Sequence, residues 1–456
     1  MFRALKIDDK KAQSLVSWAI KRPRAPQSVI MPLRCGSEPA AEACVETGQH
    51  VRAGEKIADA LAPGAVNRHA PFAGKVTRMG YLPHPVLGET PGIEIHGGDF
   101  PESFTSAGPA VEVMAGNGRD RSLLPFFRDM GLVDLDAAMQ PLHTKIAEAR
   151  GSALDVLMIN GCDPEPYITS NHALAMSHAL EILKGAEILR QAAGARHLVL
   201  AFQKNQMEAA EIVRSKIFFL RWEHAEVVIQ PSAYPYGLND LVLWHVLGTN
   251  ARGAAAAKHR ALVLNLATAF AVYEAVEQGK PLIERAVTIG GECVVEAKNV
   301  CVPLGTRLEE AFRFCGGLLR DPGRVLINGP MAGQAQTSLE VPVLPGTAAL
   351  LALAKEITVI RETLPCDRCG LCVEICPSDL APAGLVLAAE RGEWQDARAA
   401  GIEHCIECGG CAFICPSRLP MAHFIHQAKA ALGPVIRSPR SGGSGVRPLL
   451  APGVGA

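Results

Sequence analysis

Residues 366–377 read CDRCGLCVEICP, and residues 405–416 read CIECGGCAFICP. Each stretch has the spacing C-x2-C-x2-C-x3-C-P, and the second begins 39 residues after the first. Three closely spaced thiolates can bind three irons at one face of a [4Fe–4S] cube, while the fourth cysteine, on the following helical turn, reaches a neighbouring cube. The repeat therefore predicts a small helical domain organised around two clusters.

Bacterial two-cluster ferredoxins share this spacing, and in them the fourth cysteine of each run binds the cluster of the other run. We therefore expect one [4Fe–4S] cluster on Cys366, Cys369, Cys372 and Cys415, and a second on Cys405, Cys408, Cys411 and Cys376. Structural zinc is the alternative, but zinc sites typically use pairs of cysteines with longer spacers. Two four-cysteine runs of the same spacing favour iron–sulfur clusters.

The chain has 14 cysteines, and six of them lie outside the two runs without ligand spacing. The N-terminal residues contain no apolar segment followed by a cleavage site, so we expect no secretory signal and a reducing compartment. Free cysteine often behaves as a small buried apolar residue. We expect that role for Cys35, Cys44, Cys162, Cys293, Cys301 and Cys315.

The length of 456 residues suggests three or four domains, with 48% apolar and 20% charged residues. A net charge of −1 leaves no basic footprint for general nucleic-acid binding. The longest apolar stretches, 261–276 and 347–355, are too short or too polar to span a bilayer. We expect both to be buried helices.

Residues 28–100 alternate short apolar runs with glycine and proline, which predicts β-structure. The pieces TGQHVRAGEKI (47–57) and APFAGKV (70–76) resemble the two halves of a biotinyl- or lipoyl-type barrel-sandwich hybrid. The hairpin that carries the modified lysine in those domains is replaced by APGAVNRHAP (62–71). This region therefore reads as a docking module.

Strand and helix patterns alternate between about 120 and 250, which indicates a parallel, Rossmann-like sheet. Strands are predicted at 154–159, 198–203 and 225–230, and helices at 172–193 and 205–217. Residues 260–345 begin with a helix at 268–278 and continue as short strands around a helix at 307–315, as in a small β-grasp domain. From 349 to about 432 the pattern predicts helices.

The order of these modules resembles the C subunit of the Rnf complex, the membrane-associated ion-translocating ferredoxin:NAD oxidoreductase, over about residues 28–430. The resemblance rests on the phrases NGCDPEPY (160–167), YPYG (234–237), GKPL (279–282), CGG (315–317), NGPM (328–331) and CIECG (405–409). It implies a multidomain α/β and α+β fold. The expected parts are an N-terminal extension (1–27), a barrel-sandwich hybrid (28–105), a Rossmann-like α/β domain like the flavin subunit of complex I (115–255), a soluble-ligand-binding β-grasp domain (256–345), a helical two-[4Fe–4S] ferredoxin-like domain (349–432) and a disordered tail (433–456).

The resemblance implies an electron-transfer subunit that relays electrons through two [4Fe–4S] clusters, between a nicotinamide or ferredoxin side and membrane subunits. It implies a peripheral position on the cytoplasmic face of the inner membrane, with the membrane subunits, ferredoxin or a flavin-bearing protein as partners and no nucleic acid. A cobalamin-reductase-like protein, or a stand-alone NADH-dependent flavin and iron–sulfur reductase, is the alternative. In cobalamin reductases the flavin domain comes first, whereas here the barrel-sandwich module leads.

The FMN loop departs from the family pattern GxVGxGGAGFPTHxK, because residues 131–145 read GLVDLDAAMQPLHTK. Aspartates stand at 134 and 136 in place of glycines that would let the backbone approach a phosphate. At ~4 Å each like-charge pair costs on the order of 4 kcal/mol before screening. The alternative role for Asp134 or Asp136 is a helix N-cap. Both interpretations leave the phosphate without a site.

The remaining FMN and NADH positions implied by the family are Lys145, Asn160, Asp163 and Glu165. Asp163 and Glu165 could equally form a solvated acidic turn after a strand. Family members usually have an acidic residue soon after the YPxG motif, and this chain has Leu238 and Asn239 there. Two hypotheses follow: an NADH-linked flavoprotein with a divergent loop, or a relay that has lost FMN and uses its clusters alone. The replaced glycines favour the relay and make FMN and NADH binding doubtful.

Overall fold

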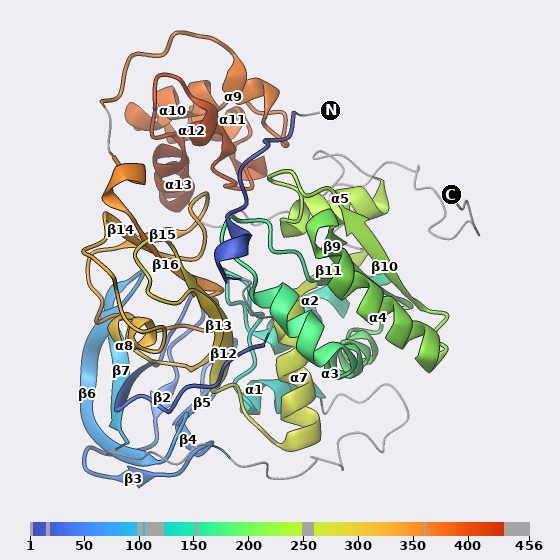
Figure 1. The fold of residues 1–456 in the computed structure, drawn as a ribbon, viewed down its shortest axis with the longest axis vertical. Helices are drawn as coiled ribbons and strands as arrows, with labels where there is room; N and C mark the ends of the chain where they lie inside the picture. Colours follow the sequence, from blue (N-terminus) through green and yellow to red (C-terminus); the bar gives the residue numbers. More distant parts are fainter. Residues whose placement is uncertain are drawn as a thin grey trace. The chain divides into compact units, whose positions relative to one another are not determined.

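The computed structural model describes residues 3–14, 19–97, 104, 123–150, 154–248, 260–359 and 362–432 (Figure 1). The predicted disordered tail, 433–456, lies outside the described residues. The chain divides into two compact units. The larger unit comprises Asp9–Ile229 and His259–Val359, and the smaller comprises Met1–Asp8, Gln230–Lys258 and Ile360–Ala456.

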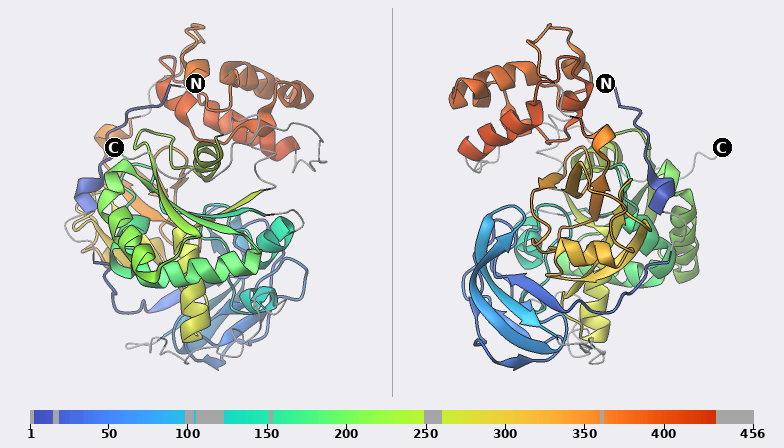
Figure 2. Two further views of the ribbon diagram at one scale, coloured as in Figure 1. Left: turned by 90° about the vertical axis from the view of Figure 1, so that its right-hand side faces the viewer. Right: turned by 60° about the vertical axis from the view of Figure 1, so that its left-hand side comes forward.

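Residues 28–96 of the larger unit form strands, as predicted. The strands make two sheets, of orders β1-β7-β6-β3 and β2-β4-β5. The strands are β1 (Ser28–Pro32), β2 (Glu42–Ala43), β3 (His50–Val51), β4 (Lys56–Asp59), β5 (Arg68–His69), β6 (Gly74–His84) and β7 (Gly88–His96). The long antiparallel hairpin of β6 and β7 is the longest feature of this part, drawn in blue in Figure 2. Buried Val29, Ile57, Ile93 and Ile95 contribute to one core.

The second sheet has the order β10-β9-β8-β11 and carries the α/β pattern. Its strands are β8 (Val156–Asn160), β9 (His197–Gln203), β10 (Ala225–Gln230) and β11 (Ala261–Asn265), and its helices are α1 (Leu123–Asp129), α2 (Leu142–Arg150), α3 (Ser170–Ala193), α4 (Met207–Leu220) and α7 (Leu266–Gln278), with the short 3-10 helix η3 (Lys204–Gln206). Strand β8 pairs in parallel with both β9 and β11. All five residues of β8 are buried, as expected for a strand covered on both faces.

Helix α3 packs against α4 and α7, and it approaches α7 at Gly185. A Cβ atom at Gly185 would lie 1.8 Å from the carbonyl oxygen of Ala269. Only glycine therefore allows the two helix backbones to approach this closely.

The expectation of one buried helix at 261–276 is wrong in its first part. Residues Ala261–Asn265 form β11, and the helix begins at Leu266, where the Asn265 side chain accepts a hydrogen bond from the amide of Ala267 (2.9 Å). A short all-apolar run fits a buried strand as well as a helix, so periodicity could not separate them. This strand and helix also belong to the α/β sheet, not to the β-grasp segment that was expected to begin at 256.

The third sheet has the order β13-β12-β16-β14-β15 and is accompanied by one short helix. The elements are β12 (Glu284–Gly290), β13 (Lys298–Pro303), α8 (Leu308–Arg313), β14 (Arg324–Ile327), β15 (Gln334–Gln336) and β16 (Ala349–Leu353), followed by the 3-10 helix η4 (Lys355–Ile357). Strands β12 and β16 are parallel neighbours, and the other pairs are antiparallel.

Strand β16 corrects two predictions, since both 347–355 and the segment from 349 onward were expected to be helical. Leu350 and Ala352 pack into one buried cluster, whereas Ala349, Leu351 and Leu353 pack into another. The strand thus alternates between two apolar environments, and a run that is apolar on both faces hides its period of two. The third sheet therefore extends past the boundary expected at 345.

The smaller unit is helical in its described residues and holds both cysteine runs. Its helices are α5 (Asn239–Leu247), α9 (Leu371–Glu374), α10 (Pro382–Glu390), α11 (Trp394–Ala399), the 3-10 helix η5 (Ile402–His404), α12 (Gly410–Ile414) and α13 (Met421–Leu432). A core of Leu385, Val386, Ile402, Met421 and Ile425 joins α10, η5 and α13.

Among the described helices of the chain, none combines the length and the apolar character that crossing a lipid bilayer requires.

Candidate functional site

The two cysteine runs share one backbone conformation. Gly370 (φ 79°) and Gly409 (φ 72°) are left-handed residues that begin helices α9 and α12. Two residues earlier, Arg368 (φ 57°) and Glu407 (φ 53°) are also left-handed. The 39-residue sequence repeat is therefore a structural repeat, in which paired positive-φ residues turn the chain tightly around each group of thiols.

Four of the cysteines line one cavity: Cys376, Cys405, Cys408 and Cys411. Three of them come from the second run, and Cys376 is the last cysteine of the first run. The rest of the lining includes apolar side chains such as Ile375, Leu380, Leu385 and Ile425. The fold therefore brings together the second set of cysteines expected from the sequence.

The first set is more exposed. Cys372 is buried, whereas Cys366 and Cys369 are exposed. Burial is the main cause that raises the pKa of the Cys372 thiol, and the nearby Cys369 and Cys415 raise it further. Cys415 belongs to the second run but lies close enough to Cys372 of the first run to affect its pKa. Crossed ligation requires this kind of proximity between the two runs.

Burial raises the pKa of the four thiols that line the cavity. Burial and the neighbouring cysteines raise the pKa of Cys408 and of Cys411 to about 12. Since thiolates are the metal-binding form, cluster binding at this cavity must release protons. Backbone amides are already in place, because Leu380 N and Glu407 N each donate to a cysteine sulfur, of Cys376 and Cys405 respectively, at 3.4 Å.

Single-ion sites are a different case. No group of three or more His, Cys, Asp or Glu side chains within the described ranges could hold one metal ion. A [4Fe–4S] cube spreads its four thiolates around four irons, whereas zinc gathers them around one ion.

The YPYG loop lies against the second cysteine run. The Tyr234 hydroxyl donates to the carbonyl oxygen of Cys408 (2.5 Å), and Tyr234 is 2% exposed. Its backbone pairs with that of Leu5 through two hydrogen bonds (2.7 and 2.9 Å). Lys429 Nζ donates to the carbonyl oxygen of Cys405 (2.9 Å). Sequence spacing gave no signal for these contacts, because each joins residues far apart in the chain.

The loop that replaces the FMN loop is held by Asp134, which is fully buried. Its carboxylate accepts hydrogen bonds from Lys145 Nζ (2.5 Å), the Thr268 hydroxyl (2.6 Å) and the amide of Asn265 (3.0 Å). Burial alone would raise the pKa of Asp134, but the charge and the hydrogen bonds of these partners lower it below its usual value. Asp134 is thus a buried carboxylate with a full set of partners, and it is not a helix N-cap.

Asp136 closes the turn that follows. Its carboxylate accepts from the amides of Ala138 (3.0 Å) and Met139 (3.1 Å) and lies 3.6 Å from Lys145 Nζ. Burial, and then repulsion by Asp134, raise its pKa to about 6. Asp136 therefore caps a turn, since helix α2 begins only at Leu142.

Arg285 is a buried, charged neighbour of the loop that the sequence analysis did not identify. It is 2% exposed and donates from Nε to the carbonyl oxygen of Thr347 (3.0 Å). Burial lowers its pKa to about 10, and attraction by Asp134, Asp136 and Asp163 opposes that shift. A second cation thus balances the acidic residues of the loop.

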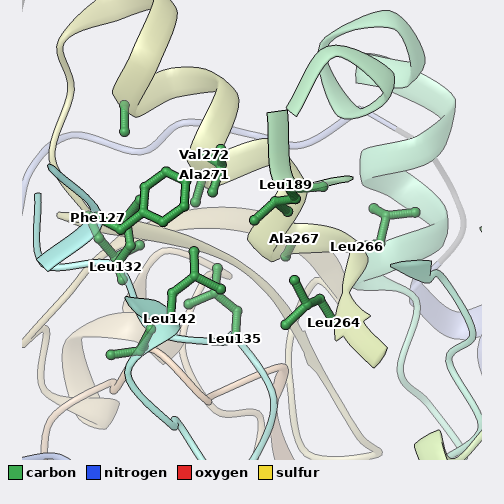
Figure 3. Close-up of a cluster of buried hydrophobic side chains, with 14 of the residues drawn as sticks. Phe127, Leu132, Leu135, Leu142, Leu189, Leu264, Leu266, Ala267, Ala271 and Val272 are labelled. Carbon is green, nitrogen blue, oxygen red and sulfur yellow. The ribbon is translucent and has the colours of Figure 1, made fainter. Parts of the chain in front are cut away.

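The loop also contributes to the hydrophobic core. Leu132, Leu135 and Leu142 lie near residues of β11 and α7, as Figure 3 shows. Met139 is buried with a left-handed backbone (φ 51°). The loop is therefore packed at Leu132, Leu135, Met139 and Leu142, whereas Ala137 and Ala138 are exposed.

The other predicted flavin and nicotinamide positions make hydrogen bonds within the protein. Asn160 Oδ1 accepts from the amide of Cys162 (3.0 Å). Asp163 accepts from the amides at the start of α3, His172 among them (2.9 Å). Glu165 accepts from the amides of Met331 and Ala332, both at 2.9 Å. Asp163 and Glu165 are 2% and 7% exposed, so the alternative of a solvated acidic turn is wrong.

Five of the six other cysteines are buried, as expected: Cys35, Cys162, Cys293, Cys301 and Cys315. Burial raises the pKa of Cys35 to about 11 and of Cys315 to about 12, so these thiols are protonated packing residues. Cys44 is exposed, and the expectation of burial is wrong there.

Four family models match successive parts of the chain. They describe an RnfC barrel-sandwich hybrid domain (residues 3–98), a Nuo51 FMN-binding domain (127–274), an SLBB domain (286–335) and a 4Fe–4S dicluster domain (365–419). Their order agrees with the order of modules predicted from the sequence.

Curated relatives match most of the chain. The C subunit of the proton-translocating ferredoxin:NAD⁺ oxidoreductase complex of Clostridium ljungdahlii is 30% identical over 377 residues, 82% of this chain and 81% of that one. The C subunit of the ion-translocating oxidoreductase complex of Rhodobacter capsulatus is 32% identical over 382 residues, 83% and 72%. The C subunit of the Na⁺-translocating ferredoxin:NAD⁺ oxidoreductase complex of Acetobacterium woodii is 27% identical over 374 residues, 81% and 83%.

The two cofactors implied by these matches differ in how well the residues fit them. The cysteine runs fit [4Fe–4S] clusters, because four thiols from both runs line one apolar cavity with amide donors beside them. The loop at 131–145 does not fit a flavin phosphate. Its lysine is paired with Asp134, and a dianion placed there would meet two carboxylates.

Proposed function

The chain belongs to the family of C subunits of ion-translocating ferredoxin:NAD oxidoreductase complexes, and from this premise we propose that it relays electrons through two [4Fe–4S] clusters within such a complex. The observation that carries this proposal is the cavity lined by Cys376, Cys405, Cys408 and Cys411. One cysteine of the first run enters the group of the second, as a two-cluster ferredoxin-like domain requires.

We assign Cys405, Cys408, Cys411 and Cys376 to one cluster, and Cys366, Cys369, Cys372 and Cys415 to the other. When bound, [4Fe–4S] clusters supply one-electron transfer. The chain's residues supply thiolates, backbone amides aimed at sulfur, and apolar walls that restrict water. These hydrogen bonds and this exposure set the potential of such a centre.

The two sets of cysteines differ in exposure, and this difference indicates which cluster exchanges electrons with a partner. The first set includes exposed Cys366 and Cys369, while the cysteines of the second set are at least partly buried. Electron exchange with a partner is favoured where a centre lies near the surface. We therefore assign exchange with a partner protein to the first set.

The partners that this function requires are the membrane subunits of the complex, together with ferredoxin or a flavin-bearing protein. A peripheral position on the cytoplasmic face of the membrane fits this role. A cobalamin-reductase-like or stand-alone reductase function is less well supported, because the barrel-sandwich module leads the chain and the curated relatives are subunits of complexes.

The test is iron analysis of the full chain purified without oxygen, with cysteine variants. The wild-type protein should hold about eight irons and eight sulfides per chain. Cys376→Ser should lose the cluster on Cys405, Cys408 and Cys411 and retain about four irons, even though Cys376 belongs to the other run. The matched control is Cys44→Ser, which changes an exposed cysteine outside the runs and should leave the iron content unchanged.

Two results would contradict the assignment. Zinc in place of iron would exclude the relay altogether. A Cys376→Ser protein in which only the cluster on Cys366, Cys369 and Cys372 is damaged would exclude crossed ligation.

A further inference from the structure

Asp134 lies at a position where an α/β sheet normally receives an anionic ligand. Strands β8 and β11 are parallel neighbours, and Asn160 and Asn265 are register partners at their carboxyl ends. Ligands of open α/β sheets bind outside this edge. Asp134 is hydrogen-bonded to the amide of Asn265, at the point where β11 ends and α7 begins.

The groups around Asp134 are those that a phosphate would need. They are the ammonium of Lys145, the hydroxyl of Thr268 and a backbone amide at the N-terminus of the 13-residue helix α7. Helix N-termini favour anions through their free amides and their dipole. All three donors are directed to the two oxygens of a carboxylate that belongs to the chain.

We propose that Asp134 is an internal substitute for the flavin phosphate, so that this chain binds no FMN and receives electrons singly, from a one-electron donor. Asp136 completes the substitution, because it lies 3.6 Å from the same ammonium and holds the turn through two amides. The inference rests on the proposed relay function and names the class of donor for it.

Packed side chains, as well as the ion pair, occupy the space that a phosphate would need in this loop. Leu135 and Met139 are 3% and 6% exposed. A Cβ atom at Gly346 would lie 2.6 Å from the carbonyl oxygen of Asp136 and 2.7 Å from Cγ of Met139, so the turn that precedes β16 closely approaches the loop. A phosphate would have to displace both a buried ion pair and these packed side chains.

The nature of the electron donor follows from electron counting. NADH gives up two electrons as a hydride, and a flavin is the group that can accept both and release them one at a time. Iron–sulfur centres are filled by single electrons. Without a flavin, the donor must therefore be a one-electron carrier, such as an iron–sulfur protein or a flavin semiquinone on a partner. The donor is oxidised by one electron for each centre reduced.

The experiment uses the full chain, purified without oxygen and loaded with iron and sulfide. FMN is titrated into the wild-type protein while flavin fluorescence is recorded, with riboflavin, which lacks the phosphate, as the control ligand. We expect no saturable FMN binding. Saturation at about one FMN per chain, with riboflavin binding more weakly, would overturn the inference.

The second arm measures reduction of the clusters by absorbance. Reduced methyl viologen, a one-electron donor, should bleach the clusters, and NADH should not. Bleaching by NADH alone would overturn the inference and leave the relay standing. Failure of methyl viologen to reduce any centre would instead overturn the proposed function.

A variant tests the substitution directly. In Asp134→Gly with Asp136→Gly, the ammonium of Lys145 is freed, and inorganic phosphate should raise the thermal stability of this protein but not of the wild type. If phosphate stabilises neither protein, Asp134 does not occupy an anion site. If the double variant does not fold, the FMN titration of the wild-type protein still decides the question.

Discussion

Replacing Lys145 by methionine should strongly destabilise the loop and helix α2. The Lys145 Nζ to Asp134 Oδ2 distance is 2.5 Å, and the two side chains are 18% and 0% exposed. At an effective dielectric constant near 20 this attraction is about 7 kcal/mol, before the cost of removing both groups from water. Without the cation, the Asp134 carboxylate remains buried with only the Thr268 hydroxyl and the Asn265 amide as hydrogen-bond donors in its immediate contact. Breaking such a pair typically costs about 3–5 kcal/mol.

The assay is hydrogen–deuterium exchange with mass spectrometry, because the chain has two units and need not unfold in one step. Peptides covering 131–150 should lose about 3–5 kcal/mol of protection in Lys145→Met. Peptides of α13, in the smaller unit, should not change. The matched control, Lys216→Met, removes an exposed lysine of α4 and should leave both regions unaffected.

A double variant separates this effect from a general intolerance of the site. Replacing both charges, with Asp134→Leu and Lys145→Met together, removes the unpaired carboxylate and should recover most of the lost stability, since apolar replacements of buried pairs are often neutral. A loss below about 1 kcal/mol in Lys145→Met would refute the reasoning. The reasoning would also be refuted if the loss of stability in the double variant equalled the sum of the losses in Asp134→Leu and Lys145→Met alone.

Three further changes test other parts of the structure. Burial raises the pKa of Glu165 from 4.5 to about 7, so the free energy of unfolding of the larger unit should fall by about 3 kcal/mol as pH rises from about 4.5 to 7. Glu165→Gln should abolish this pH dependence in urea titrations at several pH values, and an unchanged dependence would contradict the prediction. Gly185→Ala places a Cβ atom 1.8 Å from the Ala269 carbonyl oxygen, so it should cost about 3 kcal/mol or more in exchange protection of α3 and α7, and a cost near zero would disprove the close helix contact. Tyr234→Phe removes the hydrogen bond to the Cys408 carbonyl oxygen and should cost about 1 kcal/mol of protection around α12 while the iron content is kept; loss of iron would show a larger role.

The grouping of the cysteines could be predicted because their spacing is local. The spacing within each run determines which thiols can share a face of a cluster, and the 39-residue repeat points to a crossed pair. The cavity that contains Cys376 with three cysteines of the second run agrees with this expectation. Helices α3 and α4 have exposed as well as buried positions and were predicted because their periodicity is visible in the sequence.

Features that depend on distant residues were not predictable. The sequence shows that the aspartates at 134 and 136 depart from the glycine-rich family pattern. Their partners could not be predicted, because Thr268 and Asn265 approach Asp134 only after β11 and α7 have packed beside the loop. Strand β16 was missed because both of its faces are apolar. Tyr234 contacts the second cysteine run across 174 residues of sequence, and no local pattern encodes such a contact.

Electron paramagnetic resonance of the fully reduced chain tests crossed ligation most directly. Two clusters that share their ligand runs lie close enough for their unpaired spins to interact, so the wild-type spectrum should be broadened by spin coupling. In Cys376→Ser the spectrum should become that of one isolated [4Fe–4S]⁺ centre, held by Cys366, Cys369, Cys372 and Cys415. Two independent signals in the wild-type protein, with no sign of interaction, would contradict the arrangement.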